Sequence, residues 1–268
     1  MKRPELTREF LEELYRKHHR LENLNPDPLI FARGYDDPLE GEIAGLIAGV
    51  FAYGNVKQIV KNLTLIFDEL GEKPREAILS TEPNEWPKRF PKFAYRFHKT
   101  QDISLFFWLL RQALEQNSSL VNIFTKARYT SISENLSAFT AQLLSGDARP
   151  LLPVAELPKG HPVRHLVSSP ANGGAAKRMC LFLRWMVRSD ALDPGYWHGL
   201  VASDELVVPL DVHVGRVGRH FGLTRLKSPG WKMAKEITES LKEFDPEDPL
   251  RYDFTLFRYG MEEIPPEK

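Results

Sequence analysis

Two segments decide the fold: Pro170-Ala-Asn-Gly-Gly-Ala-Ala-Lys177 and Pro209-Leu-Asp-Val-His-Val-Gly-Arg-Val-Gly-Arg-His-Phe-Gly-Leu223. The first is a turn of small residues that ends at a lysine. In the second, Asp211 is a preferred N-cap residue, so it predicts a helix that buries Val214, Val217 and Phe221. Lys177 and Asp211 are therefore both expected at helix N-termini.

Helical spacing extends through the rest of the chain. Residues 42–51 carry apolar side chains at i, i+3, i+4, i+7 and i+8, which predicts one buried stripe with small residues that permit close packing. After a turn at 52–55 the pattern resumes over 59–70, and further helices are predicted over 104–116, 132–144 and 231–244 and after 245–249. Residues 146–162 contain four prolines and two glycines and predict an irregular connector. Strand-like alternation is almost absent, and the predicted fold class is all-α.

The helix that begins at Lys177 is predicted to be amphipathic. At about 100° per residue its apolar side chains share one face and its cations lie on the opposite face. The apolar set is Met179, Phe182, Leu183, Met186 and Val187, and the cationic set is Lys177, Arg184 and Arg188. We therefore expect the two arginines to be exposed.

Composition excludes several classes of protein. A chain of 268 residues with 42% hydrophobic and 27% charged residues is ordinary for a globular protein. The charged N-terminus does not resemble a signal peptide, and no run of about 18 apolar residues occurs, so we expect a cytoplasmic protein without a membrane partner. The single cysteine, Cys180, excludes an internal disulfide, a cysteine-built zinc site and a four-cysteine iron–sulfur cluster. No cluster has metal-ligand spacing, and we expect neither a metal nor a cofactor.

Charge is unevenly distributed along a chain whose net charge is +0. Residues 161–235 contain eleven Lys or Arg and five acids, whereas residues 236–268 contain four bases and ten acids. A basic window within a neutral protein fits a local nucleic-acid contact, and it equally fits a solvated surface of uneven charge.

Four segments in the same order resemble the helix-hairpin-helix superfamily of DNA glycosylases, the endonuclease III-like proteins. They are residues 46–55, 170–186, 210–223 and 253–260, of which Asp211-Val-His-Val-Gly-Arg-Val217 is the most specific. The resemblance implies a helix-hairpin-helix core with a DNA cleft between two helical subdomains. It implies an N-terminal helical segment (1–40) on the C-terminal subdomain, a helical subdomain (41–160) and a catalytic subdomain (161–268). We also expect membership in a prokaryotic family catalogued without a function.

The same resemblance implies a lysine–aspartate catalytic pair, Lys177 and Asp211. The hairpin is longer than the family's usual turn, so Arg178 is the alternative occupant of the lysine position. The spacing is nearest to the archaeal 8-oxoguanine glycosylases, and no iron–sulfur cluster is implied. The residues expected to contact DNA are Tyr53, Asn55, Asn172, Gly173, Gly174, Arg178, Arg184, Arg188 and His213, and Trp197 is expected in the base pocket.

Two functions follow as hypotheses. In the first, Lys177 attacks the sugar of a damaged nucleotide in double-stranded DNA, with 8-oxoguanine as the preferred substrate, and Asp211 stabilises the developing cation. This is a monomeric base-excision glycosylase with AP lyase activity. In the second, the protein is a non-catalytic helix-hairpin-helix module that binds DNA or RNA structure. For the single residues, a surface lysine and a simple helix cap are the alternatives to catalysis.

Overall fold

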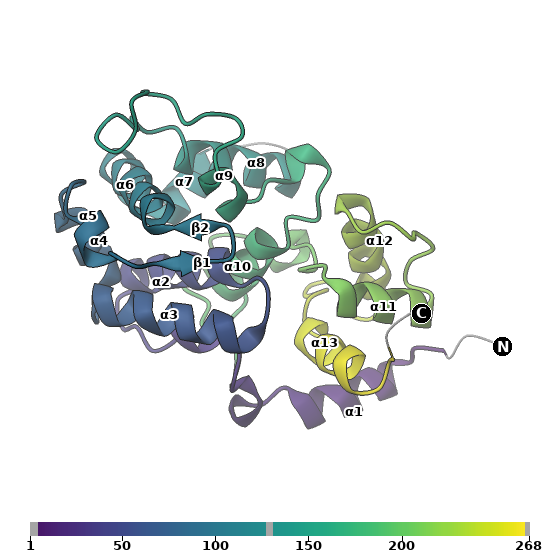
Figure 1. The fold of residues 1–268 in the computed structure, drawn as a ribbon. Coiled ribbons are helices and arrows are strands. Elements are labelled where there is room, and N and C mark those ends of the chain that lie inside the picture. Colours follow the sequence, from purple (N-terminus) through teal and green to yellow (C-terminus); the bar gives the residue numbers. More distant parts are fainter. Residues whose placement is uncertain (1–4, 127–130, 266–268) are drawn as a thin grey trace.

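The computed structural model describes residues 5–126 and 131–265, and helices dominate its architecture (Figure 1). The α-helices are α1 Arg8–His18, α2 Pro38–Phe51, α3 Val56–Leu70, α4 Pro74–Ser80, α5 Trp86–Arg89, α6 Thr100–Asn117, α7 Leu120–Lys126, α8 Ile132–Leu143, α9 Val163–Leu166, α10 Lys177–Val187, α11 Val212–Phe221, α12 Trp231–Lys242 and α13 Asp253–Glu262. Short 3-10 helices are η1 Leu21–Leu24, η2 Pro28–Ala32, η3 Pro170–Asn172 and η4 Ser203–Glu205. Strands β1 Ala94–Tyr95 and β2 His98–Lys99 form a small antiparallel hairpin.

The centre of the molecule is the contact between α2 and α10. Every residue of α2 from Glu40 to Phe51 is buried, so the helix is enclosed on all sides rather than along one stripe. The small residues of α2 let the two backbones approach. A Cβ atom built on Gly45 would lie 2.4 Å from Met186 Cε, and one built on Gly49 would lie 3.2 Å from Phe182 Cβ. The expected close packing of this glycine- and alanine-rich helix is confirmed.

The later helices form a second group with the N-terminal helix. Helix α13 packs against α11 and α1, and α12 packs against α11 (Figure 1). Helix α1 therefore contacts the C-terminal group, while η2, which follows it in the chain, packs on α2 and α3. On the other side of the molecule α3, α4 and α7 pack against α2, and α6 packs against α4, α7 and α8.

The predicted helices occur close to their expected positions. Asp211 is the N-cap of α11, as its residue type predicts, and Gly222 ends this helix in the left-handed conformation. Helices α6, α8 and α12 match the predicted ranges within a few residues, and α13 begins at Asp253. The structure confirms the all-α prediction. In the described ranges, no helix is long and apolar enough to cross a membrane.

Candidate active site

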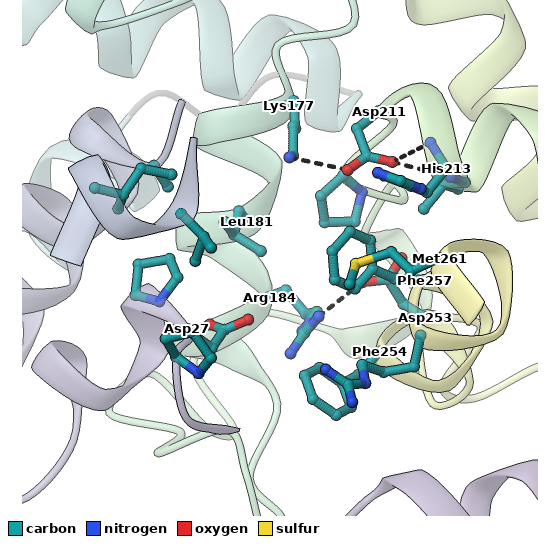
Figure 2. Close-up of a pocket in the computed structure, with 18 of the residues that line it drawn as sticks. Asp27, Lys177, Leu181, Arg184, Asp211, His213, Asp253, Phe254, Phe257 and Met261 are labelled. Atoms are coloured by element: carbon teal, nitrogen blue, oxygen red, sulfur yellow. Dashed lines mark hydrogen bonds and ion pairs between the residues drawn. The ribbon is translucent and has the colours of Figure 1, made fainter. Parts of the chain in front are cut away.

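A cavity of about 590 Å³ opens where the two groups of helices meet (Figure 2). Its lining comes from the η1–η2 segment, the turn between α2 and α3, and helices α10, α11 and α13. The apolar part of the lining includes Leu181, Trp185, Phe254, Phe257 and Met261. Its volume is in the range typical of pockets that enclose a small organic ligand.

Lys177 stands at the mouth of this cavity as the first residue of α10. Its Nζ donates a hydrogen bond to Asp211 Oδ2 at 3.1 Å, and its side chain is 36% exposed. The residue before it, Ala176, has φ 46° and ψ 32°, a left-handed conformation that side chains with a Cβ rarely adopt. This strained cap sets the direction in which α10 begins.

Asp211 uses its two carboxylate oxygens for two different tasks. Oδ1 accepts hydrogen bonds from the backbone N–H groups of His213 (2.8 Å) and Val214 (2.9 Å), which caps α11. Oδ2 faces Lys177, and the side chain is 13% exposed. Capping therefore fixes the carboxylate and leaves its second oxygen directed at the lysine.

The structure distinguishes the two residues that compete for the lysine position. Arg178 is buried and lies away from Asp211, because its guanidinium donates to the backbone carbonyls of Val50 and His165 and covers the ring of Tyr53. Burial lowers the pKa of Arg178 to about 10. Of the two side chains, Lys177 is the one that contacts Asp211.

His213 lines the cavity beside the pair. Its Nδ1 lies 2.8 Å from Arg216 Nη2, and its ring meets the ring of Phe257 edge to face. Asn55 also lines the cavity, is exposed, and caps α3 through a hydrogen bond from the N–H of Lys57. These two candidates thus lie where contact with a ligand is feasible.

The expected phosphate-binding turn is exposed at all three of its residues, Asn172, Gly173 and Gly174. Gly173 has φ 75°, which favours glycine, and its N–H is already donated to Pro170 O. Its carbonyl accepts from the N–H of Trp231 and so joins the turn to the start of α12. The backbone N–H groups of Asn172 and Gly174 remain the candidates for a phosphate contact.

The predicted exposure of Arg184 and Arg188 is wrong. Both side chains are buried and paired with acids, Arg184 with Asp193 and Asp253, and Arg188 with Asp190, Asp193 and Asp248. Burial disfavours both charged groups, but these carboxylates outweigh it and raise the pKa of each guanidinium. Neither arginine is free to bind a phosphate on the surface, although Arg184 contributes to the cavity floor.

Two of the predicted aromatic site residues, Trp197 and Tyr53, do not line this cavity. Trp197 is fully buried outside the cavity, and its Nε1 donates to Glu42 Oε2 at 2.8 Å. Tyr53 is half-buried, and its hydroxyl lies 2.5 Å from Nδ1 of the buried His98. Both side chains satisfy polar atoms within the core, which the local sequence does not reveal.

Two carboxyl groups that the sequence did not indicate line the cavity. Asp253 begins α13 and accepts from Arg184 Nη1 at 2.7 Å, and Asp27 caps η2 by accepting from the N–H of Leu29 at 2.9 Å (Figure 2). Burial raises the pKa of both groups, although hydrogen bonds and the charge of Arg184 oppose it. An Asp-Pro pair at Asp27 is a helix-start signal, but sequence alone does not connect it to Lys177.

Comparison with known proteins gives a family and no individual relative. No curated protein and no solved structure matches the chain. Among the residues that the structure describes, no group of three or more His, Cys, Asp or Glu side chains is arranged to hold a metal ion. The family model described as "Protein of unknown function (DUF2400)" matches residues 27–262, and the chain therefore belongs to this family.

Proposed function

We propose that the protein is a DNA glycosylase with AP lyase activity that acts on a damaged base in double-stranded DNA. The observation that carries the proposal is the 3.1 Å contact between Lys177 Nζ and Asp211 Oδ2 at the mouth of an aromatic-lined cavity. A base removed from the duplex needs such a cavity, because the reacting sugar must stay outside beside the nucleophile while the base is enclosed. Trp185, Phe254 and Phe257 supply apolar walls for a flat ring.

The chemistry assigns one task to each member of the pair. The Lys177 nitrogen forms a bond to C1′ as the glycosidic bond breaks, and the base leaves with the electron pair and takes up a proton. The C1′–O4′ bond then breaks, its electron pair stays on O4′, which takes up a proton, and an imine forms between C1′ and the lysine nitrogen. Loss of a C2′ proton next forms the C2′–C3′ double bond and expels the 3′-phosphate with the C3′–O electron pair. Asp211 lies close enough to accept the lysine proton and to stabilise positive charge that develops on the sugar.

Reductive trapping tests the nucleophile directly. Incubating the protein with borohydride and duplexes that contain 8-oxoguanine or an abasic site is expected to give a covalent protein–DNA complex. Lys177→Gln removes the amine and should abolish trapping, and Asp211→Asn should slow it by about 10²-fold or more, because it removes the charge but keeps the cap. Lys232→Gln is the matched control, since Lys232 lies in the first turn of α12 outside the cavity.

The same experiment separates this proposal from the non-catalytic alternative. A helix-hairpin-helix module without chemistry would bind the lesion duplex at low salt and give no trapped complex on any substrate. Because Arg184 and Arg188 are buried, alanine substitutions there would report on stability rather than on phosphate contact. Trapping that persists in Lys177→Gln would place the nucleophile elsewhere in the chain.

A further inference from the structure

We propose that the β1–β2 hairpin forms a separate contact surface for single-stranded DNA and stacks an unpaired base outside the cavity. The inference goes beyond the proposed function, because it depends neither on the lysine–aspartate pair nor on cleavage. The surface, which we call the hairpin patch, consists of Arg96 and Phe97 at the tip of the hairpin, Lys99 in β2, and Arg164 and His165 in α9. None of these residues lines the cavity shown in Figure 2.

The tip of the hairpin carries two residues that are unusual in a tight turn. Phe97 is a large apolar residue where turns usually have small or polar ones, and it is 64% exposed. Arg96 precedes it with φ 53°, a conformation that residues with a Cβ rarely adopt. Backbone strain of this kind persists only where the surrounding structure fixes it, and it is common at ligand contacts. The fold therefore holds an uncovered aromatic ring at a strained turn.

The base of the hairpin is anchored on both sides of the tip. Tyr95 and His98 are buried, and the Tyr95 hydroxyl donates to the carbonyl of Tyr53. His98 Nε2 donates to the carbonyl of Pro162 at 3.0 Å, and its Nδ1 lies 2.5 Å from the Tyr53 hydroxyl. These bonds tie the hairpin to the turn after α2 and to the start of α9. A tip that is already fixed loses little conformational entropy when it binds a ligand.

The neighbours of Phe97 leave its ring suited to a single stacked base. The guanidinium of Arg96 lies over the ring, 5.6 Å from its centroid, and the ring of His165 meets it edge to face with centroids 6.0 Å apart. Burial and the charge of Arg178 lower the pKa of His165, which favours its neutral ring. An aromatic ring beside a cation is the usual platform for unpaired bases, since every base has a π-face.

The same neighbours disfavour insertion of Phe97 into a duplex. A ring that enters between two base pairs must offer both of its faces, and Arg96 lies over one face of the Phe97 ring. One face remains for a base, and in a duplex the faces of a base are covered by its stacked neighbours. An unpaired base is therefore the ligand that fits this ring.

The charge around the hairpin patch is complementary to a nucleic-acid backbone. Residues 86–101 contain five Lys or Arg, residues 157–169 contain two, and neither range contains an acid. Within the described part of the chain, Arg96, Lys99 and Arg164 form no ion pair, and Arg164 donates only to backbone carbonyls. Their charges are therefore not neutralised and can attract phosphates.

The hairpin patch adjoins the cavity at Gly54. This glycine lines the cavity, and a Cβ atom built on it would lie 3.2 Å from Arg96 Cδ. A strand bound on the patch would thus lie next to the cavity without entering it.

Fluorescence anisotropy with an oligothymidylate of about 16 nucleotides tests the stacking contact. Phe97→Ala should weaken binding about tenfold or more, because the stacked base loses its partner ring. Phe97→Tyr keeps a ring and should bind as tightly as the wild type. Leu200→Ala is the matched control, since Leu200 is 61% exposed between α10 and α11, outside the patch and the cavity. Its affinity should equal that of the wild type.

A strand without bases separates stacking from phosphate contact. An oligomer of tetrahydrofuran units carries the phosphates alone, so Phe97→Ala should leave its affinity unchanged. Arg96→Asn removes one charge, and asparagine tolerates the left-handed backbone. This variant should reduce the slope of log K against log salt concentration by about 0.7 for both strands.

The hairpin patch would be overturned if the wild type failed to bind oligothymidylate or if Phe97→Ala did not weaken that binding. An equal loss for the base-free strand would also overturn it. An equal loss for a blunt duplex would show that Phe97 inserts between base pairs and would overturn the assignment to single strands. Strand binding that depends on Phe97, without borohydride trapping on any duplex, would support the patch and overturn the lyase alone.

Discussion

The two ends of α10 hold their cations in opposite ways. At the first residue, Lys177 is 36% exposed and contacts one carboxylate, Asp211. Two and three turns later, Arg184 and Arg188 are 4% exposed, and both pair with Asp193, which is completely buried. Figure 1 shows α10 between the two groups of helices, so one helix carries both environments.

The difference indicates that Lys177 is a candidate for chemistry, whereas Arg184 and Arg188 stabilise the fold. A buried charge is tolerated only with several partners, and removing one partner leaves an uncompensated charge. A partly exposed ion pair contributes little to stability, and its members can exchange partners when a ligand arrives. The carboxylates at the C-terminal end come from the segment after α10, from the segment between α12 and α13 and from the start of α13, so they join the two groups of helices beside the cavity.

Loss of Asp193 should have the largest effect on stability. Asp193→Ala removes the acid that Arg184 and Arg188 share, and breaking a buried pair typically costs about 3–5 kcal/mol. Urea denaturation should show this loss in the free energy of unfolding. Thermal denaturation should show a fall in Tm of roughly 10 °C. Asp204→Asn changes an exposed acid and should stay within about 0.5 kcal/mol of the wild type. A loss below about 1 kcal/mol for Asp193→Ala would erase the contrast between the two ends.

A smaller effect on the free energy of unfolding is expected when the pH is lowered, and it also arises at the C-terminal end of α10. Burial disfavours the Asp190 carboxylate, but its interactions with His19 and Arg188 outweigh burial and hold its pKa below the usual range. A depressed pKa stabilises the fold above the unfolded value of about 3.9, and this contribution is lost as pH falls.

Asp190→Asn should therefore flatten the acid limb of the stability curve. Below about pH 4 the wild type should lose up to about 1.4 kcal/mol per pH unit from this one group, and the variant should lack that share. Urea denaturation at half-unit steps from pH 5 to pH 3 measures the difference. Parallel curves for the two proteins would contradict the assignment.

Local patterns predicted the helices, because apolar spacing and caps are properties of neighbouring residues. Asp211 is the clearest case, since an Asp before Val-His at a helix start both caps α11 and directs one oxygen outwards. Helical spacing also placed Arg184 opposite the apolar face of α10, but it did not reveal that a second buried surface covers that face. The acids that neutralise Arg184 are Asp193 and Asp253, which lie 9 and 69 residues away from it along the chain.

The cavity could not be predicted from local sequence patterns either, because its lining residues are distant from one another along the chain. Asp27 and Lys177 are separated by most of the chain and line one cavity only because the η1–η2 segment folds back beside α10. The predicted pairing of Lys177 with Asp211 came from a family resemblance rather than from spacing. Trp197 was expected in the base pocket because it lies between the segments that carry Lys177 and Asp211, yet its indole N–H donates to the buried Glu42.

The smallest effect on stability should come from the residue on which the proposed chemistry depends. Lys177→Met removes an ion pair that is partly exposed on the lysine side, so the expected loss is less than about 1 kcal/mol after solvent screening. Asp211 keeps its two backbone hydrogen bonds, and α11 should remain capped. The same variant is expected to lose all borohydride trapping. A loss of several kcal/mol would show that Lys177 holds the two groups of helices together, and it would assign both ends of α10 to stability.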